Sequence, residues 1–107
     1  SIMTTQVETP PAPKTVVHPF VDVLENEAEF MLVADLPGVS KDDLNITAEG
    51  NSLALEAQTE TLEYRRSFAI GDDVDLDAIA AKLEHGVLEI HLPKHAQARV
   101  RKIAVQG

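Results

Sequence analysis

The alternation of apolar and polar residues along most of this chain predicts a succession of short β-strands. In the stretch VLEIHLP, Leu88, Ile90 and Leu92 alternate with other residues, and a glycine precedes the stretch while a proline ends it. Because successive side chains of a strand point to opposite faces, this pattern indicates a strand with one buried face. A small apolar pair, Ile103 and Val105, stands apart near the end of the chain, and this strand does not explain it.

Further β-prone runs precede this strand and are separated by turn-forming residues. Gly50 and Asn51 form a two-residue hairpin signal, and Leu53, Leu55 and Ala57 after it share one face. The spacing of the runs predicts an all-β fold, an immunoglobulin-like antiparallel β-sandwich of about seven or eight strands. The runs cover residues 20–27, 29–36, 44–49, 52–58, 63–70 and 81–86.

Segments of different composition flank the predicted strands. Residues 1–17 are rich in Thr and Pro and are expected to form a flexible N-terminal arm, whose first two residues, 1–2, we interpret as a cloning remnant. Residues 18–94 are expected to form the single domain. Residues 95–107 contain few residues that could join its core, so they are expected to leave it as an extended C-terminal arm.

Composition limits the core and the partners of the chain. Its 107 residues allow one domain, and with only 4% aromatic residues the core must consist mainly of Leu, Val, Ile and Ala. A formal charge of -9 repels phosphate backbones and anionic bilayers, so we expect neither nucleic acid nor membrane as a partner. The lack of cysteine, of a signal peptide and of any apolar run of about 20 residues suits the cytoplasm.

Candidate metal and catalytic sites have little support. The acidic stretch 71–80 is expected to be turn-like, with one helical turn from Asp75, and with Glu84 it has the oxygen spacing of a calcium loop. Ala78 stands where such a loop needs glycine, and the four histidines lack a ligand spacing, so we expect no metal site. Without a catalytic serine elbow, a cysteine or a phosphate-binding loop, we expect no enzyme activity and no cofactor.

The strand predicted at 63–70 carries a basic and aromatic cluster. Tyr64, Arg66 and Phe68 lie on one side of this strand, with Arg65 on the other. Arginine and aromatic residues are enriched at subunit interfaces, but both arginines could equally pair with carboxylates of their own chain. The two interpretations stay open.

Several ordered motifs between residues 18 and 94 resemble the small heat shock proteins, whose shared unit is the α-crystallin domain. The most specific motif is AKLEHGVL, an alanine followed after four residues by Gly-Val-Leu, with His85 where the family usually has asparagine or aspartate. The segments VADLPGVSKDD, YRRSF and HLPK also resemble family segments. The matching residues of the first motif are Ala81, Gly86, Val87 and Leu88.

The resemblance implies an ATP-independent holdase of the stress response that binds partly unfolded client proteins. It also explains the apolar pair near the chain end, because family members commonly end with an Ile-x-Ile or Ile-x-Val element. This element, here Ile103-Ala104-Val105, docks into a groove of a neighbouring domain. In this sequence the groove and client surface would be lined by Leu44, Ile46, Ala81 and Leu83.

Two segments depart from the family pattern. Only TETLEY separates two strands where many bacterial and plant members carry a long loop that swaps a strand into the partner. We therefore expect a homodimer through the edge of the LEYRRSF strand, as in animal relatives, unless loop residues are missing from the sequence. The interface residues would be Tyr64, Arg65, Arg66 and Phe68.

The N-terminal arm is shorter and more polar than is usual in the family, which disfavours large assemblies and strong client capture. It suits the main alternative better, an adaptor or co-chaperone module of the same fold with one defined protein partner. A calcium-binding domain is the weakest of the three interpretations.

Overall fold

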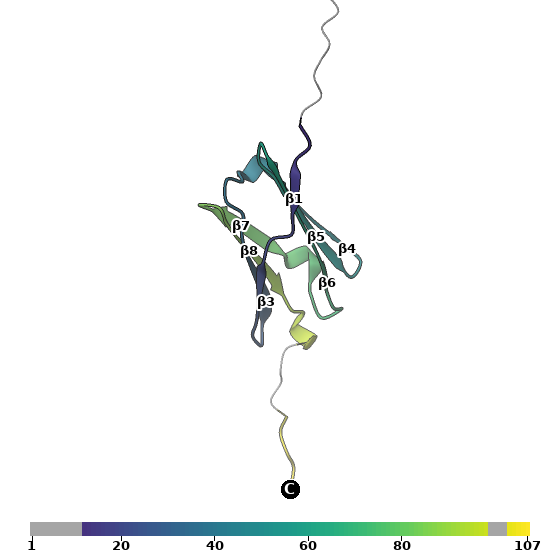
Figure 1. Ribbon diagram of the computed structural model, residues 1–107. Helices are drawn as coiled ribbons and strands as arrows, with labels where there is room; N and C mark the ends of the chain where they lie inside the picture. The colour runs from purple at the N-terminus through teal and green to yellow at the C-terminus, as the bar shows by residue number, and fades with distance from the viewer. Residues whose placement is uncertain (1–11, 99–102) are drawn as a thin grey trace, which may run out of the picture.

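Two β-sheets pack face to face in the computed structural model, which describes residues 12–98 and 103–107 of the chain (Figure 1). Each sheet has four strands, and all neighbouring strands are antiparallel except β1 and β6, which run parallel. Strands far apart in the sequence lie side by side, as β3 and β8 do. The predicted β-sandwich is therefore confirmed.

Each sheet takes its strands from separate parts of the sequence. The first has the order β1-β6-β5-β4 and the second the order β2-β3-β8-β7. The strands of the first sheet are β1 (Thr15–Val17), β4 (Leu44–Glu49), β5 (Ser52–Gln58) and β6 (Leu62–Ala69). Those of the second are β2 (Val21–Glu25), β3 (Glu29–Asp35), β7 (Ala80–Glu84) and β8 (Val87–Pro93).

Residues at every second position of the inner strands form the core. On β5, Leu53, Leu55 and Ala57 are buried between the sheets while their neighbours are less buried. Burial of each large aliphatic side chain contributes about 1.5–3 kcal/mol, so an aliphatic core suffices despite the shortage of aromatic residues. The buried residues are Leu32, Ala34, Leu36, Val39, Leu53, Leu55, Ala57, Tyr64, Ile70, Val74, Leu88, Ile90 and Leu92.

Tight turns join the strands at the predicted places. Gly50, with φ of 56°, and Asn51 connect β4 to β5. In the β2–β3 turn, the backbone N–H of Asn26 donates to the carbonyl oxygen of Glu29 (3.0 Å). The side-chain Oδ1 of Asn26 accepts bonds from the N–H groups of Ala28 and Glu29, which would otherwise lack partners in the turn.

The turn between β7 and β8 explains the His85-Gly86 pair. Both residues have positive φ (51° and 75°), as the two central residues of a type I′ turn require. Histidine tolerates this conformation better than most residues other than Gly, Asn and Asp. A Cβ atom at Gly86 would lie 3.3 Å from the carbonyl oxygen of Leu36. Both the backbone angle and the available space therefore favour glycine.

At both ends of the domain the structure contains short elements that the sequence pattern does not predict. Thr15–Val17, part of the expected flexible arm, form the short strand β1; all three residues are β-branched, which favours extended structure. After β8, Ala96–Ala98 form a 3₁₀ turn rather than extended chain. The helical turn expected from Asp75 is present at Leu76–Ala78, where the Asp75 side chain accepts a bond from the N–H of Asp77.

Candidate functional site

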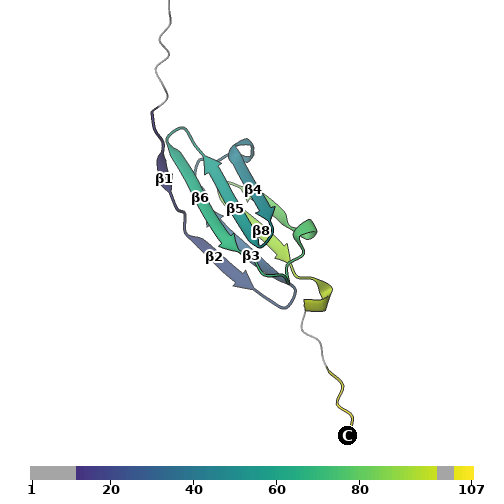
Figure 2. The same ribbon diagram turned by 90° about the vertical axis from the view of Figure 1, so that its right-hand side faces the viewer.

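Two edge strands, β4 and β7, border the space between the sheets on one flank of the sandwich (Figure 2). Residues 18–20 connect β1 directly to β2, so those two strands share one flank, and β4 and β7 end the same sheets on the other. Among the residues described, neither β4 nor β7 has a neighbour on its outer edge. Such an edge presents unpaired backbone N–H and C=O groups to any extended segment.

The four groove residues predicted from the sequence face the interior of this flank. Leu44 and Ile46 of β4 lie opposite core residues of β5, and Ala81 and Leu83 of β7 lie opposite core residues of β8. Directly opposed residues point to the same face of a sheet. Ala81 is exposed and the other three are half-buried, so their apolar surface is incompletely covered. We call these four residues the β4–β7 flank.

The predicted tail element does not cover this flank within its own chain. Ile103 and Val105 are 83% and 91% exposed. Residues two apart on an extended segment point to the same side, so the two side chains can enter two neighbouring pockets of another molecule. A single chain therefore leaves both the tail element and part of the β4–β7 flank open.

The basic and aromatic cluster on β6 makes contacts within the chain. Tyr64 is buried in the core, and its hydroxyl lies 3.4 Å from the carbonyl oxygen of Pro37, to which it donates. The Nη1 of Arg66 donates to the carbonyl oxygen of Pro19 (2.6 Å), and its guanidinium lies 4.7 Å from the centre of the Phe68 ring.

Arg65 points to the opposite side of β6 and pairs with a carboxylate of the same strand, since its Nη2 lies 2.6 Å from Glu63 Oε1. The bond to Glu63 raises the pKa of Arg65, and Coulombic attraction adds to this. Both arginines thus have partners in their own chain. The predicted dimer interface on β6 stays a prediction, and β1 already pairs with Leu62–Tyr64 along that edge.

The AKLEHGVL motif forms most of the β7–β8 hairpin, and the strand β7 of this hairpin is one border of the β4–β7 flank. Ala81 faces the flank, Gly86 occupies the type I′ turn, and Leu88 is buried in the core, while Val87 is partly exposed beside it. The motif therefore combines one strand edge, one turn and one core position in eight consecutive residues.

No cluster of three or more His, Asp or Glu side chains able to hold a metal ion occurs within the described part of the chain. Asp75, which lies in the acidic stretch 71–80, caps the 3₁₀ turn with its side chain. No helix in residues 12–98 or 103–107 is long and apolar enough to cross a membrane.

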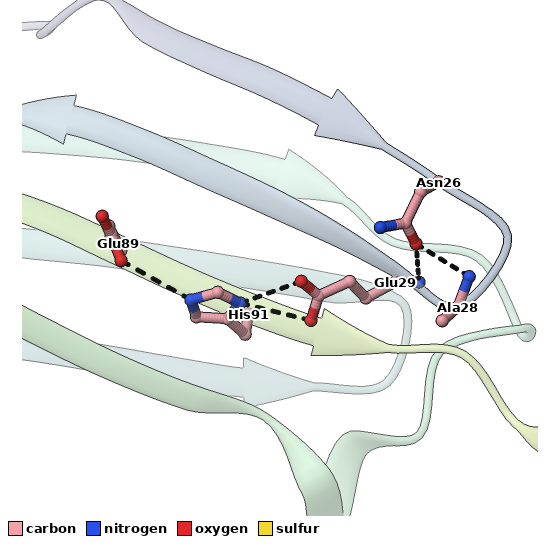
Figure 3. A network of polar contacts seen from close by, with 5 residues as sticks. All are labelled: Asn26, Ala28, Glu29, Glu89 and His91. Carbon is pink, nitrogen blue, oxygen red and sulfur yellow. Dashed lines mark hydrogen bonds and ion pairs between the residues drawn. The ribbon is translucent and has the colours of Figure 1, made fainter.

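A polar network on the outer face of the second sheet was missed by sequence reasoning (Figure 3). His91 Nδ1 lies 3.1 Å from Glu29 Oε1, and Nε2 lies 3.6 Å from Glu89 Oε2. The bond to Glu29 is the main cause of a raised His91 pKa, which partial burial only partly offsets. Glu29 and His91 lie on neighbouring strands but far apart in the sequence, so no local pattern could reveal the contact.

Exposed apolar side chains are also present on β1, on β2 and on the segment that joins them, and sequence reasoning did not single them out. We call Val16, Phe20, Val23 and Leu24 the β1–β2 flank. The signal was present in the sequence: VDVL has apolar residues at adjacent positions, as expected when both faces of a strand are covered.

Known proteins resemble this chain in sequence and fold. A probable 15 kDa heat shock protein of Leptospira interrogans is 31% identical, with 86% of this chain and 81% of the relative covered. The crystal structure of a small heat-shock protein from Xylella fastidiosa is 33% identical, covers 83% of this chain and 96% of its own, and superposes with a TM-score of 0.67. Heat shock protein 16.0 from Schizosaccharomyces pombe is 25% identical over 84% of this chain and 99% of its own, also with a TM-score of 0.67.

The chain spans about two thirds of the length of some curated relatives. A small heat shock protein of Rickettsia felis is 26% identical, and the match covers 84% of this chain and 65% of the relative. The sequence model of the Hsp20/alpha crystallin family matches residues 22–106, which include the strands from β3 to β8, the AKLEHGVL motif and the tail element. The chain is therefore a member of the Hsp20/alpha crystallin family of small heat shock proteins.

Proposed function

We propose that this protein is an ATP-independent holdase, and the incompletely covered β4–β7 flank is the observation that carries the proposal. The side chains of this flank face the space between the sheets. They remain accessible because β4 and β7 are edge strands. Partly unfolded proteins expose apolar surface that would otherwise coalesce. A chaperone that covers such surface opposes aggregation by mass action, and this step needs no nucleotide.

The tail of a second copy is the competing occupant of this flank in the proposal. The exposed pair Ile103 and Val105 has the spacing to fill two apolar pockets while the tail backbone pairs with β4 or β7. Release of the tail would then free the same surface for a client. The formal charge of -9 would keep the complex of chaperone and client dispersed in solution. The proposal places this activity in the cytoplasm.

Light scattering from a heat-labile test protein, warmed without ATP, tests the proposal. We expect suppression at a near-stoichiometric ratio, and a severalfold weaker suppression by Ala81→Glu, which places a charge on the flank. Ala80→Glu is the matched control, because Ala80 is exposed on the same strand but points to the outer face, opposite His91. Equal loss in both variants would remove the flank from the mechanism.

An adaptor or co-chaperone module with one defined partner is the second candidate, favoured by the polar composition of residues 3–17. It predicts saturable one-to-one binding and no general effect on aggregation. The same scattering experiment separates the two, because a chain that stays folded without suppressing aggregation contradicts the holdase.

A further inference from the structure

Lys94, the first residue after β8, has a nearly buried side chain. This side chain is only 9% exposed, whereas that of Lys82, which also pairs with a carboxylate, is 66% exposed. Lysine side chains are almost never fully buried unless their charge has a partner. The burial of Lys94 therefore points to a specific set of contacts.

Three groups of the β2–β3 hairpin surround the Lys94 ammonium. Its Nζ donates to Glu25 Oε2 (2.6 Å) and to the carbonyl oxygen of Asn26 (2.9 Å). It also lies 4.7 Å from the centre of the Phe30 ring, whose face attracts a cation. An ammonium has three N–H donors, so these groups satisfy most of its bonding capacity. Glu25 and Lys94 are 69 positions apart, so the contact joins the two ends of the second sheet's sequence.

The backbone at Lys94 is also held, and by two different segments. The N–H of Lys94 donates to the carbonyl oxygen of Ala28 in the β2–β3 turn (2.8 Å). The N–H of His95 donates to the carbonyl oxygen of Asp73 (2.8 Å), which precedes the 3₁₀ turn before β7. Pro93 before them has a fixed φ, which restricts the direction of the chain. We call Pro93, Lys94 and His95 the arm base.

The arm base is the place where the chain leaves the sandwich (Figure 2). Residues 95–98 and 103–107 are exposed, so Lys94 is the last described residue whose side chain packs against the domain. Backbone bonds at the end of an element open readily. The ammonium contact adds a side-chain anchor at this point, where a small change of backbone angle would redirect the whole arm.

We propose that Lys94 is a positioning residue: its ammonium fixes the arm base to the β2–β3 hairpin and so sets the direction in which the C-terminal arm leaves the sandwich. Ile103 follows Ala98 by five positions, which span at most about 17 Å of extended chain. A fixed exit therefore limits which surfaces the tail element reaches. This direction is a property of the single chain, and only its consequence for assembly rests on the proposed docking of the tail.

Distances between two spin labels test the direction itself. The chain has no cysteine, so the labels are attached at Thr47→Cys on β4 and Gln97→Cys in the arm, both of which are exposed. An excess of unlabelled chain suppresses distances between copies. We expect a narrow distance distribution with Lys94 present. Lys94→Met, which keeps an apolar stem but removes the charge, should broaden it severalfold.

Lys82→Met is the matched control, because it also breaks a lysine–carboxylate pair, 3.1 Å from Glu84, but outside the arm base. We expect its distribution to stay narrow. A narrow distribution in Lys94→Met would overturn the proposal even if the melting temperature fell, because Lys94 would then act on stability alone. Equal broadening in both variants would overturn it too.

Glu25→Gln approaches the same contact from its exposed partner and keeps the shape of that side chain, so it decides the question if Lys94→Met does not fold. The Glu25 side chain is 56% exposed, which limits the effect of the change on the core. We expect this variant to broaden the distribution as well, because the neutral amide no longer attracts the ammonium. An unchanged width in a folded Glu25→Gln chain would then count against the proposal.

Sedimentation of the unlabelled chain measures the consequence for assembly. If the tail docks as proposed, Lys94→Met should widen the spread of sedimentation coefficients, and Ile103→Ala with Val105→Ala should abolish this difference. A broadened label distance with unchanged sedimentation would support the role of Lys94 and contradict docking of the tail. Failure of the positioning proposal is therefore distinguishable from failure of the proposed function.

Discussion

At the scale of single residues, His91 links β3 and β8 through its two ring nitrogens. The hydrogen bond to Glu29 raises the His91 pKa in the folded state. Because the pKa of His91 is raised on folding, its contact with Glu29 contributes its full stabilisation at pH values below the unfolded-state pKa of about 6.5. This stabilisation is lost as the pH rises through the folded-state pKa. Because the ring is partly exposed, the contribution should be about 0.5 kcal/mol.

We therefore expect His91→Gln to be less stable than the parent chain at pH 5.5 and equally stable at pH 8.5. Urea unfolding at the two pH values measures the difference. His95→Gln is the matched control, because His95 is exposed and follows β8. A deficit of His91→Gln that does not change with pH would show that the ring acts by packing rather than by charge.

At the scale of elements, the β7–β8 hairpin depends on Gly86 for two separate reasons. Its positive φ costs about 1–2 kcal/mol with any Cβ, and the Cβ would also press on the Leu36 carbonyl. We expect Gly86→Ala to lower the free energy of unfolding by more than Gly50→Ala does. Gly50 is a close control, since it has a similar positive φ but open space around the Cβ. Equal losses in chemical denaturation would mean that the contact with Leu36 is unimportant.

At the scale of the whole molecule, charge is distributed unevenly along the chain. Arg99, Arg101 and Lys102 directly precede the tail element, and no acidic residue follows Glu89, although the protein as a whole carries -9. A basic tail and an acidic domain attract each other, and salt screens that attraction. We expect assembly through the tail to weaken as NaCl is raised from 25 to 500 mM, measured by sedimentation. Replacing the three basic residues with glutamine should remove this salt dependence, and its persistence would contradict the electrostatic account.

How far the sequence predicts this protein depends on how local each feature is. The strands from β2 to β8 follow from the alternation of residues such as Leu53 and Leu55, and the hairpin turns follow from Gly50 and Gly86. The pairing of β1 with β6 and the contact of His91 with Glu29 join distant positions, so no short pattern encodes them. Val23 looks like an ordinary core position in the sequence, and only its place at the end of a sheet leaves it exposed.

The pairing of β3 with β8 has a consequence for how the chain folds. Glu29 and His91 are 62 positions apart, so the second sheet cannot close until nearly the whole domain has been synthesised. The successive strands β4, β5 and β6 need only short turns and can pair early. A nascent chain would then hold one finished sheet whose apolar face waits for the other. During that interval the protein is itself an aggregation-prone chain of the kind it is proposed to protect.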